Sequence, residues 1–290
     1  MPPLPGKPPH PGLSYPPLMI VIGSGPAAIA ATQALVRQGH QVTILDVGTR
    51  LEPGRQETAD RMSAQDPASW SEPDLESIIG KRPDTRERNH SKLSYGSSYS
   101  IDTRSAAIDV RWEKNAGFNH SLARGGLSNI WGSSLLPYCR DDIADWPVPL
   151  EDLEPHYRAV MEFVPCTAVK DDLEEILPSY SSRSNPLEPS RQAHALLKDL
   201  EARKFDLRKS GIVFGRSRLA IHAAENESHR GCVRCALCLS GCPYGLIYST
   251  AQTLKELIQN DTVRYLDNHL VEKLEQAGDE VVVTGRNVVT

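Results

Sequence analysis

The sequence lacks any apolar run near the roughly 18 residues that a membrane span requires, so we expect none. Residues 1–17 are rich in proline and contain no apolar stretch of the kind found in a secretory signal, which predicts a flexible tail. Positive charge is not in excess, because Lys and Arg number 32 against 37 for Asp and Glu. Charge therefore gives no reason to expect a nucleic-acid partner. A cytoplasmic protein is expected, with export alongside a partner subunit left open.

The chain of 290 residues is long enough for one large or two ordinary domains, and it has no internal repeat. We expect the folded domain at residues 18–290. The apolar run 18–22 predicts a fully buried parallel strand, 26–39 a helix that Gly39 ends, and 41–46 a second strand. This β-α-β order predicts an α/β fold with a parallel sheet and helices on both of its faces.

The remainder of the chain is less regular. Residues 51–118 predict an irregular excursion, with a short helix near 74–79. Further helices are expected at 150–164, 190–203 and 251–259, and short strands at 262–266, 269–275 and 280–284. The late strands predict a small antiparallel element. The strand-like end of the chain predicts that the sequence is truncated.

A glycine-rich turn lies directly between the first predicted strand and helix, with the pattern G-x-G-x-x-A. Gly23 allows the tight turn, Gly25 lets the backbone approach a pyrophosphate, and Ala28 permits close packing of helix on strand. Asp46 ends the second strand, where an acid can bind ribose hydroxyls. The pattern predicts a dinucleotide site but does not separate NAD from FAD. The predicted contacts within the turn are Gly23, Ser24, Gly25, Pro26, Ala27 and Ala28.

A second glycine-rich segment follows at residues 124–132, with the sequence RGGLSNIWG. Its adjacent glycines remove side chains where the backbone approaches a ligand, and Ser128 and Asn129 can donate hydrogen bonds to phosphate or ring atoms. Taken alone, the segment is also compatible with an ordinary turn between elements.

These two segments, in this order, resemble the FAD-binding part of glucose–methanol–choline oxidoreductases. The stretch 146–157 (WPVPLEDLEPHY) is similar to one in the gluconate- and sugar-dehydrogenase branch, as are 216–220 and 242–245. The resemblance touches most of residues 18–290 and implies an incomplete fold of this family. It places Gly125, Gly126, Ser128, Asn129 and Gly132 beside the flavin, and Val271 beside the adenine.

The resemblance implies a dehydrogenase that oxidises the CH–OH group of an alcohol or sugar and passes electrons to an outside protein or quinone. Some members attach FAD through a histidine where this chain has Ile130, so non-covalent FAD is expected. No stretch matches the family's catalytic histidine motif, and no catalytic residue is nominated. An NAD(P)-linked reductase remains an alternative, as does a truncated flavin-binding or electron-relay module without a complete catalytic site.

Four of the six cysteines gather in the segment 226–248, and the last of the four is followed by Pro243. They are Cys232, Cys235, Cys238 and Cys242. Their spacing is that of a ferredoxin cluster segment, so an iron–sulfur cluster is one hypothesis. A zinc site, and cysteines that are unligated or paired in a disulfide, are the others. In the branch that the chain resembles, a cluster in this region passes electrons from the flavin.

Overall fold

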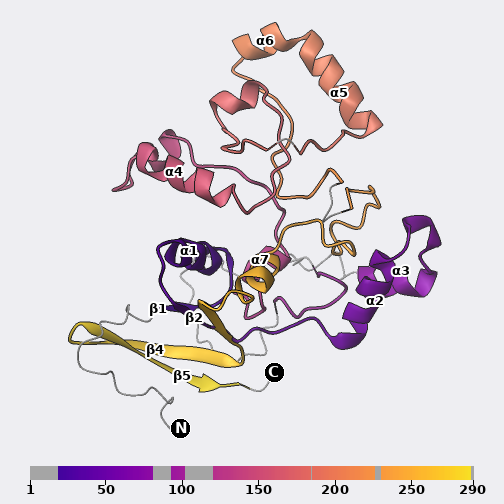
Figure 1. Ribbon diagram of the computed structural model, residues 1–290. Coiled ribbons are helices and arrows are strands. Elements are labelled where there is room, and N and C mark those ends of the chain that lie inside the picture. Colours follow the sequence, from indigo (N-terminus) through magenta and orange to yellow (C-terminus); the bar gives the residue numbers. More distant parts are fainter. Residues whose placement is uncertain (1–18, 81–92, 102–119, 184, 226–229, 289–290) are drawn as a thin grey trace, which may run out of the picture.

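The computed structural model describes residues 19–80, 93–101, 120–183, 185–225 and 230–288 (Figure 1). The predicted tail at 1–17 lies outside the described residues, as does much of the excursion at 51–118. The strands are β1 (Met19–Ile22), β2 (Val42–Leu45), β3 (Val263–Leu266), β4 (His269–Ala277) and β5 (Glu280–Asn287). The α-helices are α1 (Pro26–Arg37), α2 (Pro53–Ser63), α3 (Glu72–Ile79), α4 (Leu150–Val160), α5 (Arg191–Ala202), α6 (Lys204–Lys209) and α7 (Thr250–Leu257).

The predicted β-α-β unit is present and opens a parallel sheet. In the described residues, three strands pair in the order β1-β2-β3, with Met19 opposite Val42 and Val42 opposite Val263. Helix α1 begins with a proline at its first turn, and Gly39 lies just past its end with a φ of 84°. Both features suit a helix that starts and stops at these points. The mixed α/β class is therefore confirmed.

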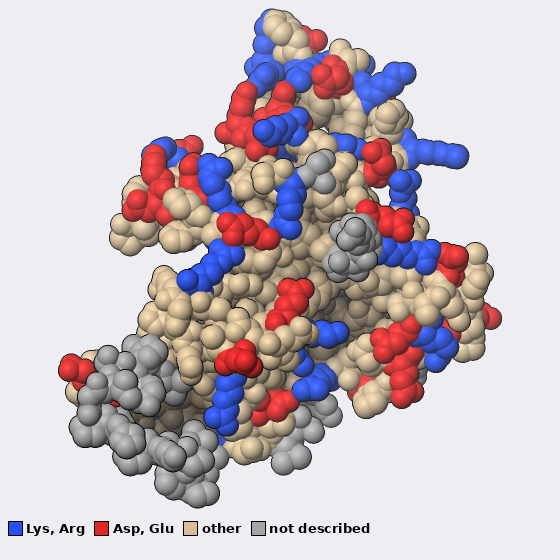
Figure 2. All heavy atoms as spheres, viewed as in Figure 1, with Lys and Arg blue, Asp and Glu red and all other residues tan. Residues whose placement is uncertain are grey.

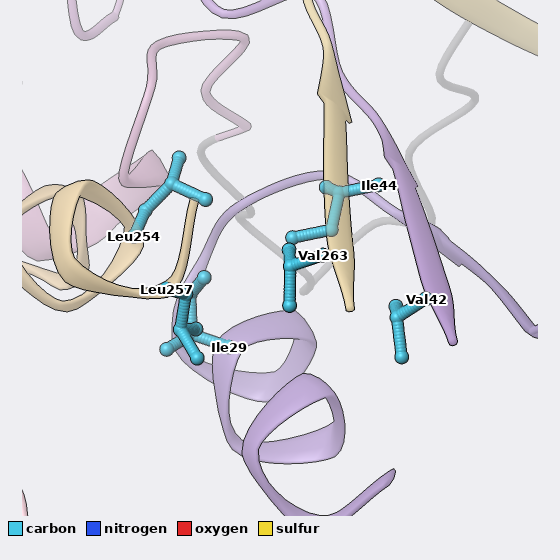
Figure 3. Close-up of a cluster of buried hydrophobic side chains, with 6 residues drawn as sticks. All are labelled: Ile29, Val42, Ile44, Leu254, Leu257 and Val263. Carbon is cyan, nitrogen blue, oxygen red and sulfur yellow. The ribbon is translucent and has the colours of Figure 1, made fainter. Parts of the chain in front are cut away.

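The main apolar core lies between this sheet and two helices that are far apart in sequence. Helices α1 and α7 meet over one face of the sheet (Figure 3). The core is formed by Ile29, Val42, Ile44, Leu254, Leu257 and Val263. Each such side chain contributes about 1.5–3 kcal/mol when fully buried. This packing fixes the start of α1 against the start of α7, which is where the candidate site lies.

The prediction of a fully buried first strand is wrong. On β1, Ile20 is 40% exposed and Ile22 is 45% exposed, while Met19 and Val21 face the core. The cause is that, within the described residues, α1 and α7 cover only the core face of the sheet, so Ile20 and Ile22 on the other face stay exposed. The prediction of helices on both faces is not met there. The continuous apolar run alone could not distinguish the two faces.

The predicted irregular excursion contains more helix than expected. Helix α2 was missed, and it packs against α3 through Ala59, Met62 and Ile78. Only a short apolar stripe marks α2 in the sequence, because its other side chains are mostly polar. The pair lies beside the segment that holds the cysteines, to the right in Figure 1.

The antiparallel element is a hairpin of β4 and β5, which pair from His269 opposite Asn287 to Ala277 opposite Glu280. It extends below the parallel sheet in Figure 1. Helices α4 and α5 carry no buried residue. These peripheral elements leave the interior formed by the sheet, α1 and α7 as the framework of the site.

Candidate functional site

The first glycine segment turns the chain from β1 into α1 and leaves its backbone open. Gly23 has a φ of 82°, and its N–H donates to the carbonyl of Leu45 at 2.7 Å. A Cβ on Gly23 or Gly25 would meet no other atom within 4 Å. Helix α1 has no side-chain cap and no acid in its first turn. Its leading N–H groups and the positive end of its dipole can therefore serve an anion.

The second glycine segment packs directly behind the first. A Cβ on Gly126 would lie 3.1 Å from the Cα of Gly25. The N–H of Gly125 donates to Ser24 Oγ at 2.9 Å. The two segments, which are about a hundred positions apart in the chain, thus meet at the N-terminus of α1. Glycine is required at Gly126 both by this close approach and by a φ of 58°.

Ser128 and Asn129 hold this loop together in the structure. Ser128 Oγ donates to the carbonyl of Gly125 at 2.5 Å and accepts the N–H of Thr250 at 2.9 Å. Asn129 Nδ2 donates to the carbonyls of Arg124 and Gly126, at 3.0 and 2.9 Å. The donors that the sequence assigns to a ligand are therefore used by the protein. Their observed part is to shape the second glycine segment.

Two residues at the start of α7 complete the loop, and sequence reasoning missed both. Thr250 Oγ1 lies 2.9 Å from the carbonyl oxygen of Ser24 and 3.0 Å from that of Gly125, and its one proton is shared between them. Ser249 caps α7 and donates to Asn129 Oδ1 at 2.9 Å. A Ser-Thr pair before a helical pattern is a capping signal, so the helix start could have been found from the sequence. The contact with the glycine segments could not.

Asp46 lies at the end of β2, as predicted, but it is only 6% exposed. Its Oδ2 accepts hydrogen bonds from Ser24 Oγ and, at 2.9 Å, from the hydroxyl of Tyr265. Burial raises the pKa of the Asp46 carboxyl above its ordinary value. The hydrogen bonds from Ser24, Tyr265, Gly48 and Val47 oppose that rise in pKa. The carboxylate is therefore bound within the protein on several sides.

Tyr265 and Arg124 form a second feature that the sequence did not reveal. Tyr265 projects from β3, and the guanidinium carbon of Arg124 lies 5.1 Å from the centre of its ring. Burial, followed by the nearby charge of Asp46, raises the pKa of the Tyr265 hydroxyl. The Nε atom of Arg124 is buried and has no hydrogen-bond partner. The guanidinium of Arg124, at the start of the second glycine segment, therefore keeps one N–H donor that no group of the described residues uses.

The other predicted contact residues lie around this centre. Pro26 and Ala27 are exposed at the start of α1, and Ala28 is half-buried. A Cβ on Gly132 would meet no other atom within 4 Å, so the space beside it is open. Val271 is half-buried on β4, a strand that begins where the N–H of His269 donates to the carbonyl of Asp46 at 2.9 Å.

The cysteine segment lies against α2 and α3. Leu237 and Cys235 pack with Met62 and Ile78, and the Tyr95 hydroxyl donates to the carbonyl of Cys242 at 2.9 Å. In the described part of the chain, which includes all four thiols, no group of three or more Cys, His, Asp or Glu is arranged to hold a metal ion. The structure therefore brings the segment together without gathering its thiols.

The surroundings of the Cys242 thiol act on its pKa in two directions. Burial raises the pKa of the Cys242 thiol, and hydrogen bonds from the backbone of Leu246, Tyr244 and Ile247 oppose the rise. Backbone N–H groups that converge on a sulfur stabilise its thiolate, which is the ligating form. Cys238, by contrast, is exposed.

The charged side chains give no single-signed surface on the face in view. Figure 2 shows Lys and Arg lying among Asp and Glu over this face. Within the described residues, no helix has the length and apolar character that crossing a membrane requires.

Comparison with known proteins adds no assignment. No protein-family model matches the chain, and a search of curated proteins found no match. Any function must therefore be argued from the residues and from their arrangement.

Proposed function

We propose that this chain binds FAD non-covalently and forms the flavin-binding part of a dehydrogenase that oxidises the CH–OH group of an alcohol or sugar. The observation that carries the proposal is the meeting of the two glycine segments at the N-terminus of α1. Gly126 lies against Gly25, while the outer sides of Gly23 and Gly25 are free of other atoms within 4 Å. An ordinary turn needs only one such segment.

The residues present fit a dinucleotide. The open backbone at Gly23 and Gly25, together with the uncapped start of α1, suits a pyrophosphate. Asp46 would contact a ribose, and Val271 the adenine. Gly125, Gly126 and Gly132 would border the flavin, while Ser128 and Asn129 act by fixing the loop. Ile130 has no nucleophilic atom for a covalent bond to the cofactor, which supports reversible binding.

The bound flavin would accept a hydride from the substrate carbon. The part of this chain is to hold and orient the cofactor and to place the positive end of α1 beside its phosphates. No residue is assigned as the base that removes the hydroxyl proton. The outside electron acceptor, a protein or a quinone, is part of the proposal and is not identified by these residues.

An iron–sulfur cluster in the cysteine segment is a separate proposal. Its support is the spacing of the four cysteines in the sequence, which is that of a ferredoxin cluster segment. As described, however, Cys232, Cys235, Cys238 and Cys242 do not make a ligand set. We therefore derive no electron-transfer step through a cluster.

The direct test is an absorption spectrum of protein purified without oxygen, followed by acid precipitation. We expect flavin bands that move to the supernatant, because no covalent bond holds the cofactor. Flavin that stays on the precipitate would overturn the non-covalent assignment. A protein that is colourless, and that gains no flavin bands when FAD is added, would overturn the flavin proposal. If that protein bound NAD(H), the alternative of a nicotinamide-linked reductase would replace it.

A further inference from the structure

The Oδ2 atom of Asp46 has no acceptor capacity left for a ligand as it lies in the structure. A carboxylate offers about four lone-pair sites, which is about two for each oxygen. Ser24 and Tyr265 both donate to Oδ2, and the residue is only 6% exposed. A ribose that binds both carboxylate oxygens through its two neighbouring hydroxyls must therefore replace one of these donors.

Ser24 is poorly suited to give way. Its side chain is 1% exposed, and its Oγ also accepts the N–H of Gly125 at 2.9 Å. Its carbonyl accepts the Thr250 hydroxyl at 2.9 Å. Releasing Ser24 would disrupt the junction of the two glycine segments.

Tyr265 is the donor that can leave. Its ring is half-buried, and rotation of a single side chain removes its hydroxyl from Asp46. The hydroxyl reaches the carboxylate only because position 48 is glycine. Gly48 has a φ of 68°, and a Cβ there would collide with the Tyr265 hydroxyl oxygen.

The other charged groups around this pair do not occupy the carboxylate. Arg124 stacks on the ring at 5.1 Å. Asp267 follows β3 and pairs with Arg50 at 2.8 Å. His269, at the start of β4, uses its backbone N–H on the carbonyl of Asp46 and its ring on the carbonyl of Asp267. None of these contacts reaches the Asp46 carboxylate, so among the described residues Tyr265 is its one side-chain donor outside the glycine segments.

We propose that the Tyr265 hydroxyl and a ribose hydroxyl of the cofactor compete for the same oxygen of Asp46, so that Tyr265 limits cofactor affinity. This inference rests on the proposed function, because it assumes that a ribose binds at Asp46. On binding, one O–H···O hydrogen bond to the carboxylate is exchanged for another, and the phenol turns away from β2.

The test is the variant Tyr265→Phe, which keeps the ring on Arg124 and removes only the competing hydroxyl. Binding of ADP, which carries the ribose and the pyrophosphate, is measured by calorimetry. We expect Tyr265→Phe to bind ADP about tenfold more tightly than the wild type. With 2′,3′-dideoxy-ADP, which has no ribose hydroxyls, the two proteins should bind equally. Tyr248→Phe is the matched control, since it removes a buried hydroxyl that pairs with Thr253 at 2.7 Å, and its ADP affinity should equal that of the wild type.

The outcomes separate this inference from the proposed function. ADP affinity that is unchanged or lower in Tyr265→Phe overturns the competition, and a lower value would mean that Tyr265 holds the carboxylate ready for the ligand. A gain that persists with the dideoxy compound also overturns it. If the wild type binds neither ADP nor FAD, the proposed function fails together with this inference.

Discussion

The glycine segments and the cysteine segment lie in different surroundings. Around Ser24 and Gly125, polar contacts join segments that are distant in sequence, and Thr250 bridges both. The cysteine segment contacts the rest of the protein through the Tyr244 hydroxyl, which donates to the carbonyl of Gln65 at 2.6 Å, through Leu237 and Cys235, and through the carbonyl of Cys242. The first region is assembled around its motif, whereas the contacts of the second leave its four thiols apart.

The difference shows what a short pattern can specify. A glycine pattern specifies a backbone path, because the absence of side chains is itself the requirement for close approach. A cysteine pattern specifies only which ligands are near one another in sequence, and the metal supplies much of the free energy that gathers them. The geometry of the glycine region therefore supports a proposal more directly.

The largest expected effect is on metal content. If the cluster proposal is right, protein purified without oxygen carries iron and acid-labile sulfide, and Cys242→Ala loses both. Cys139→Ala is the control, since Cys139 lies outside the cysteine segment and should keep both. If the wild type contains no more iron and sulfide than the buffer does, the cluster proposal is wrong, and the glycine region is left as the one supported site.

The junction of the glycine segments should be the next most sensitive feature. Gly126→Ala is expected to lower the free energy of unfolding by about 2–3 kcal/mol, because it adds a strained φ and a contact with Gly25. Gly278→Ala is the matched control, since Gly278 has a φ of 63° with no atom within 4 Å of the added Cβ. Urea unfolding measures both. Equal losses would mean that the contact with Gly25 contributes nothing.

Thr250 tests whether the bridge also serves the cofactor. Thr250→Val should cost about 1–3 kcal/mol of stability, because it removes the hydroxyl that donates to the carbonyl of Ser24, while the carbonyl of Gly125 keeps the Ser128 hydroxyl. It should also weaken FAD binding. Thr253→Val removes another buried hydroxyl on α7, one that pairs with Tyr248, and should leave FAD affinity unchanged. Equal FAD affinities in the two variants would mean that the Thr250 hydroxyl does not contribute to FAD binding.

The smallest effect concerns the protonation of Asp46. Because burial raises the folded-state pKa of this carboxyl above 3.8, the folded protein binds its proton more tightly than the unfolded chain does. The free energy of unfolding should therefore fall as the pH rises from 3.8 through the folded-state pKa. Asp46→Asn should lack this contribution, which unfolding of both proteins across the pH range measures. A difference between them that is independent of pH would contradict the raised pKa.

Much of the framework could be predicted from the sequence, because its signals are local. The alternation of apolar runs and the glycines gave β1, α1, β2 and β3, and the position of Gly25 follows from the same pattern. Helix α2 was missed because its apolar stripe is short. The exposure of Ile20 depends on which strands and helices lie beside it, and a run of apolar letters carries no such information.

The interior of the site was less predictable. The partners of Asp46 come from the first glycine segment and from β3, so Tyr265 could be found only once β2 and β3 were paired. Similarly, Ser128 and Asn129 carry donors that suit a ligand, but the start of α7 and the loop itself use them. A sequence shows which donors exist, while the fold decides which remain free.

The central claim is tested most directly by titrating FAD into Gly25→Ala, with Gly54→Ala as the control. At both positions an added Cβ meets no other atom of the protein within 4 Å, so both variants should fold. Gly25→Ala should bind FAD about tenfold more weakly or worse, because the methyl group lies where the pyrophosphate approaches the backbone. Gly54→Ala should bind like the wild type. Equal FAD affinities in the two variants would contradict a cofactor site at the junction of the glycine segments.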